Sequence, residues 1–195
     1  MRLEDDPRWR RFNDRGYACP CCGQSFSGIF DIAFDHPDPW PHGHLGASGQ
    51  DELIVAGDRL TADLCWLGEE RYIRCTLPLP LTGSDQEFRF GCWVSLSVAN
   101  FERYVDCWRV EDYAGFEGAF GWLSNRLPGV GPVVEQEDWL PADVWMMEGK
   151  ERPQIWVHRK AGRLHAMQRE GIGFDELLDI YAACGTDLRP HLADV

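Results

Sequence analysis

A run of strand-like segments in the middle of the chain constrains the fold more than any other feature. Residues 64–67 and 71–77 are both rich in residues that favour strands, and a short turn containing Gly68 separates them, which predicts a β-hairpin. Residues 87–95 then alternate between apolar and other side chains, which predicts a third strand with one buried face. The side chains expected on that buried face are Phe88, Phe90, Cys92 and Val94.

Helical periodicity is clear in two later segments. Ser97 is a predicted N-cap, because its hydroxyl can accept a hydrogen bond from a free amide of the first helical turn. Apolar residues then recur at helical spacing and predict an amphipathic helix with a buried stripe. The residues of this stripe are Phe101, Tyr104, Val105 and Trp108. A last helix is predicted from Phe174 to Cys184, and Gly185 is placed to end it in a left-handed conformation.

The order of these segments predicts the fold class. Further strand candidates lie at residues 144–147 and 154–158, whereas Pro78 and Pro80 are expected to end the hairpin ladder or to place it at a sheet edge. Strands outnumber helices and the turns between them are short. We therefore expect an α+β fold with a mostly antiparallel sheet, two or three helices and an N-terminal Cys-x-x-Cys knuckle.

Length and composition indicate one globular domain. A chain of 195 residues fits a single hydrophobic core. We expect residues 17–195 to form that domain and residues 1–16 to form a polar N-terminal extension. Hydrophobic residues make up 44% of the chain and charged residues 26%, which is typical of a globular protein and excludes a chain that is disordered throughout.

The charge balance limits the kinds of partner. The chain has 19 Lys and Arg residues against 32 Asp and Glu residues, a formal net charge of −13. Binding to nucleic acid or to an anionic membrane depends on clustered Lys and Arg, so we expect neither partner. The N-terminus is charged where a secretory signal would be apolar, and no apolar run approaches the roughly 18 residues of a membrane span. We expect a cytoplasmic protein that contacts an unknown protein or small molecule.

The sharpest motif among the eight cysteines is Cys19-Pro20-Cys21-Cys22-Gly23. Cys19 and Cys22 have the two-residue gap that lets both sulfurs reach one tetrahedral Zn²⁺. Gly23 permits a left-handed turn that aims backbone amides at the sulfurs. The motif therefore predicts a zinc knuckle, whose remaining ligands must come from elsewhere in the chain. A redox-active dithiol and a cluster of reduced thiols are the alternatives.

Motifs of several enzyme classes are absent from the sequence. The glycines of residues 115–131 do not match the spacing of a phosphate-binding loop, and neither a Gly-x-Ser-x-Gly nucleophile motif nor a His-Glu-x-x-His zinc motif occurs. These absences favour a binding role over catalysis.

Further motifs follow the knuckle in a fixed order. They are Asp63-Leu64-Cys65, Tyr72-Ile73-Arg74, residues 90–97, residues 120–125, and Arg152-Pro153 through Gln168-Arg169-Glu170-Gly171-Ile172. Together with residues 17–23 they resemble the bacterial family known as domain of unknown function 2199, over roughly residues 17–182. The resemblance implies a family without an assigned activity. It places Cys19, Cys22 and Cys65 at recurring positions and His165 at the histidine of a His-Pro-Leu step, which reads His165-Ala166-Met167 in this chain.

Three hypotheses for function remain open. The leading one is a binding or interaction module stabilised by Zn²⁺, with Cys19 and Cys22 as ligands, Cys65 as the third and His165 as the candidate for the fourth. The second is a metal-dependent hydrolase, in which three cysteines leave one zinc position open for water and His165 is a base or a ligand. The third is a bacterial immunity or regulatory protein with an acidic partner-binding face, since negative charge steers association with a basic partner.

Overall fold

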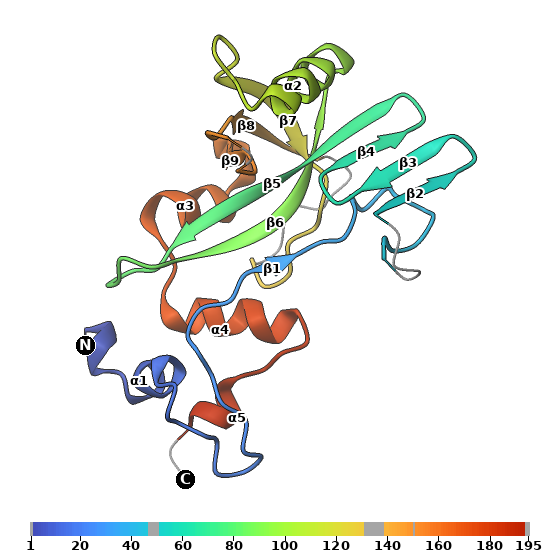
Figure 1. Ribbon diagram of the computed structural model, residues 1–195. Helices are drawn as coiled ribbons and strands as arrows, with labels where there is room; N and C mark the ends of the chain where they lie inside the picture. Colours follow the sequence, from blue (N-terminus) through green and yellow to red (C-terminus); the bar gives the residue numbers. More distant parts are fainter. Residues whose placement is uncertain (1, 47–50, 131–138, 150, 194–195) are drawn as a thin grey trace.

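The computed structural model describes residues 2–46, 51–130, 139–149 and 151–193 (Figure 1). Its centre is a closed five-stranded barrel, in which each strand pairs antiparallel with the next and the last pairs in parallel with the first. The barrel strands are β5 (Glu70–Pro80), β6 (Glu87–Leu96), β7 (Gly118–Leu123), β8 (Leu140–Trp145) and β9 (Gln154–Val157). The expected α+β class with a mostly antiparallel sheet is confirmed, and closure of the sheet leaves these five strands without a free edge.

The predicted hairpin and the strand after it are both present. β4 (Leu64–Leu67) pairs antiparallel with the start of β5, with Leu64 opposite Ile73. The residues expected on the buried face of β6 are fully buried in the main core, at 0% exposure: Phe88, Phe90, Cys92 and Val94. The alternating pattern therefore identified the face of β6 that points into the barrel.

The sheet continues beyond the barrel in a wing made of β2 (Glu52–Val55), β3 (Asp58–Thr61) and β4 (Figure 1). On the other side of the sheet, the short β1 (Ile32–Ala33) pairs in parallel with β6. A second, smaller core lies between the wing and the outer face of the barrel. It is formed by Trp40, Leu60, Cys65, Tyr72 and Trp93.

Pro78 and Pro80 do not end the ladder between β5 and β6, which runs to the pair Pro80–Glu87. Thr76 donates its amide to the carbonyl of Pro153 on the side of β5 that faces β9 (2.8 Å). Backbone groups alternate along a strand, so the nitrogens of both prolines point to that same side, away from β6. The ladder to β6 therefore loses no donor, as expected for proline at an open side of a strand.

β7 lies in the glycine-containing stretch and was not predicted from the sequence. A Cβ atom at Gly121 would lie 2.4 Å from Val94 Cγ1 and 2.7 Å from the carbonyl oxygen of Ser95 on β6. Gly121 is therefore required by the close approach of two strands rather than by a turn. Glycine lowers the strand signal of the sequence although the tertiary contact depends on it.

Two helices match the prediction. α2 (Val98–Val110) is capped by Ser97, whose hydroxyl accepts from the amide of Asn100 at 3.3 Å. Phe101 and Tyr104 of its apolar stripe are buried, whereas Val105 and Trp108 are only partly buried against the core. α4 (Phe174–Ala183) is followed by Gly185 at a φ of 88°, the predicted left-handed stop.

The structure has more helices than the two or three expected. The described residues contain five α-helices, of which the unpredicted ones are α1 (Pro7–Asn13), α3 (Arg163–Glu170) and α5 (Arg189–Leu192). Two 3₁₀ turns, η1 (Leu3–Asp5) and η2 (Arg159–Ala161), add to them. These unpredicted helices have at most eight residues, too short to show a clear 3.6-residue period. Within the described ranges, no helix is long and apolar enough to cross a membrane.

α1, α4 and α5 gather on one side of the barrel, together with the N-terminal segment (Figure 1). Residues 1–16, predicted as a polar N-terminal extension, contain η1 and α1, and Trp9 and Phe12 of α1 are buried in the main core. Their rings lie 5.1 and 5.6 Å from the ring of Phe174 at the start of α4. The two ends of the chain are thus packed together beside the barrel, and this is where the cysteine motif lies.

Candidate metal centre

The Cys19–Gly23 motif forms a tight knuckle. The amide of Gly23 donates to the carbonyl of Cys19 at 2.7 Å, and the amide of Cys19 donates to the carbonyl of Gln24 at 2.8 Å. Gly23 has a φ of 75°, so the predicted left-handed turn is present. An isolated antiparallel bridge between Ala18 and Ser25 closes the knuckle. Local hydrogen bonds therefore hold the three cysteines on one turn.

A histidine from the far end of the chain completes the group. His191 Nδ1 lies 3.5 Å from Cys19 Sγ, 3.7 Å from Cys21 Sγ and 3.4 Å from Cys22 Sγ. The candidate ligand atoms of these four residues all lie within 4.8 Å of one another. Three sulfurs and one imidazole nitrogen therefore converge on one point from both ends of the chain.

Hydrogen bonds to the backbone of α5 place His191 beside the knuckle. Tyr17, two residues before Cys19, donates its hydroxyl to the carbonyl of His191 at 2.9 Å. Arg11 of α1 donates to the carbonyl of Leu192 at 2.6 Å, and the Leu192 side chain is fully buried. These contacts come from the N-terminal segment, so the segment that carries the cysteines also holds the helix that carries the histidine.

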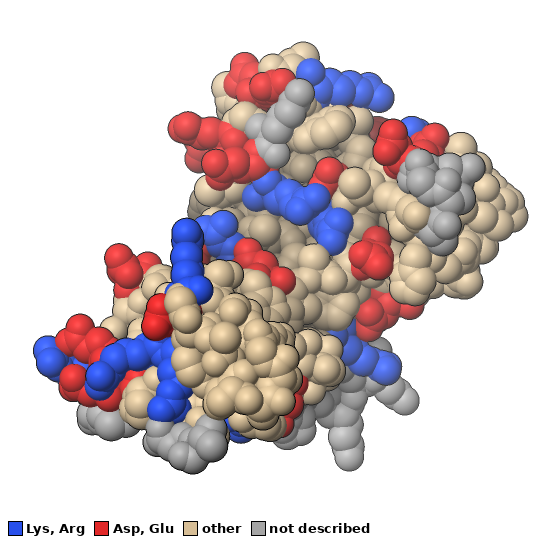
Figure 2. Space-filling model, turned by 60° about the horizontal axis from the view of Figure 1, so that its bottom comes forward, with Lys and Arg blue, Asp and Glu red and all other residues tan. Residues whose placement is uncertain are grey.

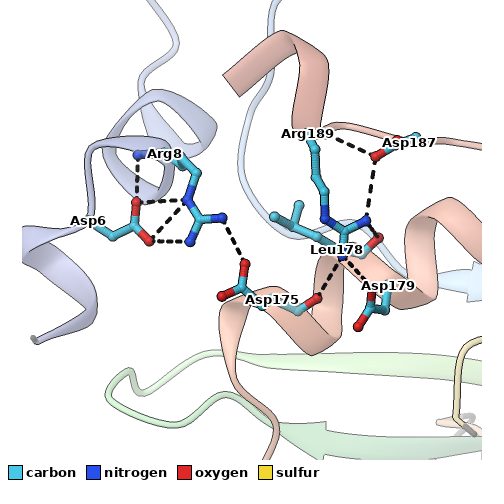
Figure 3. A network of polar contacts seen from close by, with 7 residues as sticks. All are labelled: Asp6, Arg8, Asp175, Leu178, Asp179, Asp187 and Arg189. Atoms are coloured by element: carbon cyan, nitrogen blue, oxygen red, sulfur yellow. Dashed lines mark hydrogen bonds and ion pairs between the residues drawn. The ribbon is translucent and has the colours of Figure 1, made fainter. Parts of the chain in front are cut away.

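Arg189 anchors α5 to α4 (Figure 3). Its guanidinium donates to the carbonyls of Leu178 and Asp175, at 3.4 and 3.2 Å, and pairs with the carboxylate of Asp179. A second set of contacts in Figure 3 joins α1 to α4, where Arg8 bridges Asp6 and Asp175 at 2.7 Å each. The three short helices are therefore tied by charged groups around the buried aromatic rings.

The knuckle also determines which thiol ionises first. The pKa of Cys19 is lowered to about 6, chiefly by a hydrogen bond from Cys21 (Sγ–Sγ 2.9 Å) and further by His191 and the backbone amides of Cys21 and Cys22. The pKa of Cys21 is raised to about 11, because its neighbour Cys19 already holds the negative charge. Cys19 is buried, whereas Cys21 and Cys22 are exposed, so the group has a thiolate at its base and an open approach from solvent.

The spacing of the group is compatible with a tetrahedral metal ion. Zinc bonds of about 2.3 Å to sulfur and about 2.0 Å to nitrogen place a sulfur and a nitrogen ligand roughly 3.5 Å apart. The three observed sulfur–nitrogen distances of 3.4–3.7 Å agree with this value. The Cys19–Cys21 distance of 2.9 Å is shorter than the roughly 3.8 Å between two zinc-bound sulfurs, so this pair has to separate slightly around an ion.

Cys65, expected as the third ligand, is not part of the group. It lies on β4, fully buried in the smaller core with Trp93 and Tyr72. Burial raises the pKa of its thiol to about 12, which keeps it protonated and makes it a poor metal ligand. The sequence predicted correctly that Cys65 lies on a strand, but the outer face of that strand packs against the barrel rather than against the knuckle.

His165, expected as the candidate fourth ligand, also lies elsewhere. It is half-buried on α3 and lines a hollow next to Trp156 and Arg159. Among the described residues, the Cys19, Cys21, Cys22 and His191 group is the one set of three or more potential ligands close enough to share an ion. The structure therefore brings Cys21 and His191, and not Cys65 and His165, close to Cys19 and Cys22.

His191 was not predicted because no local pattern links it to the knuckle. The residues before it, Arg189 and Pro190, indicate only the start of a short helix. His191 and Cys19 are 172 residues apart in the sequence, so their proximity depends on tertiary packing between the two ends of the chain.

Charge on the molecular surface is mixed. On the face shown in Figure 2, Asp and Glu side chains occur in separate groups with Lys and Arg side chains between them. The net charge of −13 is therefore not gathered into one acidic patch on this face.

The family model described as "Uncharacterized protein conserved in bacteria (DUF2199)" matches residues 18–172. This range contains the three cysteines of the knuckle and all five barrel strands, and it ends before α4 and α5. His191 therefore lies outside the matched range. No curated protein and no solved structure matches the chain.

Proposed function

We propose that this chain, which belongs to the DUF2199 family of uncharacterized proteins conserved in bacteria, is a binding module stabilised by one Zn²⁺. The ligands are Cys19, Cys21, Cys22 and His191. The observation that carries the proposal is the convergence of three thiols and one imidazole nitrogen within 4.8 Å. Soft sulfur ligands combined with imidazole suit Zn²⁺ in a tetrahedral site.

The ligand set favours a structural site over a catalytic one. Catalytic zinc is held by three protein ligands and keeps one position open for water, whereas four protein ligands fill a tetrahedral ion. The group supplies four. The hydrolase hypothesis required an open position beside Cys19, Cys22 and Cys65, and Cys65 is buried away from the knuckle. A structural ion that organises a binding domain is therefore the better account.

The position of the group explains what the ion stabilises. The cysteines follow α1, and His191 is on α5, so an ion bound to all four ligands crosslinks the two ends of the chain. A crosslink that closes a long loop removes much conformational freedom from the unfolded chain. Metal binding therefore contributes directly to folding stability, because the unfolded chain does not bring these four ligands together.

Elemental analysis of protein purified without chelator tests the proposal. We expect one zinc per chain, and loss of zinc when Cys19 and Cys22 are both replaced by Ser. His191→Ala is expected to weaken zinc binding at least tenfold in a competition assay with a chromogenic chelator. His165→Ala and Cys107→Ser are the matched controls, because they remove a histidine and a thiol outside the group and are expected to retain full zinc content.

Chelation provides a second readout that separates local from global effects. Removing the ion is expected to lower the melting temperature and to speed amide exchange first in residues 18–25 and 189–192, while the β5–β6 ladder stays protected. Substoichiometric zinc that the double replacement leaves unchanged would refute the metal site. If the metal-free protein instead forms a reversible Cys19–Cys21 disulfide, losing two protons and two electrons to an added oxidant, the knuckle is a redox pair.

A further inference from the structure

Exposed aromatic side chains are concentrated on the outer face of three barrel strands. Among the described residues, eight large hydrophobic side chains are exposed, and four of them are on β7, β8 and β9. These four are Phe120 (45% exposed), Trp122 (40%), Trp145 (51%) and Trp156 (37%). We call this set the aromatic face. Single exposed apolar residues are common, but a group of large ones on one surface indicates an interaction site.

Strand pairing makes the aromatic face continuous. Phe120 lies opposite Asp143 on β8, and Asp143 lies opposite Trp156 on β9. The ring of Phe120 is 5.2 Å from that of Trp122 and 5.8 Å from that of His158. Residues that alternate with these on the strands, such as Val144 and Ile155, are buried inside the barrel. The barrel is thus apolar inside, as its fold requires, and aromatic outside over these three strands as well.

One end of the aromatic face is acidic. Beyond Trp145 lies a hollow of about 540 Å³ whose lining includes Asp112, Glu117 and Glu148. We call these three residues the acidic end. The side chains of Glu117 and Glu148 are exposed and form no hydrogen bond or ion pair with any other described residue. Their charge is therefore available to a partner.

The other end is basic. Beside Trp156 lies a second hollow of about 480 Å³, lined by Arg159, His165 and Arg169. We call these three residues the basic end. Lys160 also lines the hollow, as does Asp143, whose carboxylate pairs with His158 at 3.0 Å. Within the described part of the chain, the guanidinium groups of Arg159 and Arg169 have no hydrogen-bond or ion-pair partner. Most other arginines do have one, as Arg8, Arg163 and Arg189 illustrate, so two unpaired arginines at one hollow form a local positive charge in an acidic protein.

We propose that the aromatic face is the interface of a homodimer, whose partner is a second copy of this chain. A twofold rotation places the same patch of both copies in contact, with residue i of one on residue j of the other and the reverse. When two copies face each other antiparallel, the acidic end of each meets the basic end of the other, and the aromatic side chains meet in between. The face is therefore complementary to itself in charge.

A partner of a single charge fits this surface less well. A basic partner would be repelled at Arg159 and Arg169, and an acidic one at Glu117 and Glu148. Juxtaposed like charges suppress wrong partners, while opposite charges at the rim fix the register of the right one. Aromatic residues around the centre, with most charged residues at the rim, match the composition of stable protein interfaces. The one carboxylate between Phe120 and Trp156, that of Asp143, is paired with His158 Nε2 at 3.0 Å. The proposal concerns a surface separate from the metal centre and does not depend on zinc.

Sedimentation of the full-length protein tests the dimer. We expect a species of twice the chain mass at micromolar concentration, and a shift to monomer for Trp156→Glu and for Phe120→Glu. Ile54→Glu is the matched control, because it adds the same charge at an exposed apolar site on β2 (63% exposed), at the other end of the sheet, and is expected to leave the dimer intact. Circular dichroism and the melting transition show whether each variant is folded.

A charge exchange distinguishes this arrangement from any other contact. One variant carries Arg159→Glu and Arg169→Glu, so both ends are acidic, and a second carries Glu117→Arg and Glu148→Arg, so both are basic. Each alone is expected to dissociate at least ~10-fold more readily than the wild type. Mixed in equal amounts, the two are expected to form a heterodimer, because every end then meets its opposite.

The proposal is overturned if the wild-type chain is monomeric at high concentration, since a folded monomer leaves the aromatic face to a different partner. It is also overturned if the chain is dimeric but the two charge variants dimerise as well as the wild type, or fail to pair when mixed. Either result would show that the two ends do not meet across a twofold axis.

Discussion

His191 Nδ1 lies 3.4 Å from Cys22 Sγ, although 169 residues separate the two in the chain. The contact does not arise from a local motif, because each residue is held by its own neighbours. Cys22 is on a turn closed by backbone hydrogen bonds, and His191 is on a helix held by Tyr17 and Arg189.

The first prediction concerns the protonation of the knuckle. In metal-free, reduced protein, the first thiolate is expected to appear with a midpoint near the lowered Cys19 pKa of about 6. The value belongs to the coupled group as a whole. Thiolate absorbance in the ultraviolet measures it. Cys19→Ser is expected to move the first midpoint up toward the ordinary 9.0, and Cys107→Ser to leave it in place. A wild-type midpoint near 9.0 would contradict the geometry of the knuckle.

The same shift has a consequence for stability. A lowered pKa means that the thiolate of Cys19 favours the folded state, so its contribution is present above the ordinary value of 9.0 and is lost as the pH falls toward about 6. The raised pKa of Cys21 acts in the opposite direction, since its contribution is present below 9.0 and is lost as the pH rises toward about 11. Zinc binding displaces thiol protons, so zinc affinity is expected to fall most steeply below pH 6.

The second prediction tests how α5 is positioned. Arg189→Met removes the hydrogen bonds to α4 without changing any of the four ligands. We expect zinc stoichiometry to remain at one, with affinity reduced about tenfold, because groups that orient ligands affect metal affinity on this scale. Arg163→Met is the matched control, since Arg163 pairs with Glu176 of α4 but makes no hydrogen bond to α5. Equal affinity in both variants would show that the knuckle holds His191 by itself.

The third prediction concerns barrel closure. Gly121→Ala is expected to reduce the free energy of unfolding by about 1–3 kcal/mol, because a Cβ atom there would overlap Val94 and the backbone of Ser95. Gly16→Ala is the control: its nearest neighbour is the end of the Asp14 side chain, 3.2 Å away, which can move. Urea denaturation measures both. Equal midpoints for Gly121→Ala and the wild type would mean that β7 does not approach β6 this closely.

The fourth prediction separates two members of the apolar stripe on α2. Phe101 is 2% exposed and packs edge to face on Trp66 at 5.1 Å, so Phe101→Ala is expected to cost about 3–5 kcal/mol of stability. Trp108 is only partly buried, and Trp108→Ala is expected to cost clearly less. Thermal or chemical denaturation of the two variants gives the ranking, and the reverse order would show that the helix is rotated about its axis.

Local pattern was a good guide wherever an element is long and has one buried face. The alternation of β6 and the Ser97 cap of α2 both predicted what the structure contains. The pattern failed where tertiary contact, not periodicity, determines the residue. Glycine at position 121 weakens the strand pattern, but the close approach of β6 leaves no room for a Cβ atom there. The short helices α1, α3 and α5 are stabilised by packing and ion pairs and not by a clear periodic pattern.

The sequence by itself determined the knuckle turn, because in Cys-Pro-Cys-Cys-Gly the proline restricts the backbone φ angle and the glycine permits the left-handed conformation that the turn needs. It also identified the strands β4, β5, β6 and β9, which were enough to predict the α+β class. Only the tertiary structure decided which distant residues meet that turn. A metal site needs ligands within a few ångströms of one point, and spacing along the chain carries no information about contacts made through folding. Cys65 lies in a hydrophobic core because its strand, β4, pairs with β5 of the barrel. His191 lies beside the sulfurs because the two ends of the chain pack together around aromatic rings such as those of Trp9 and Phe174.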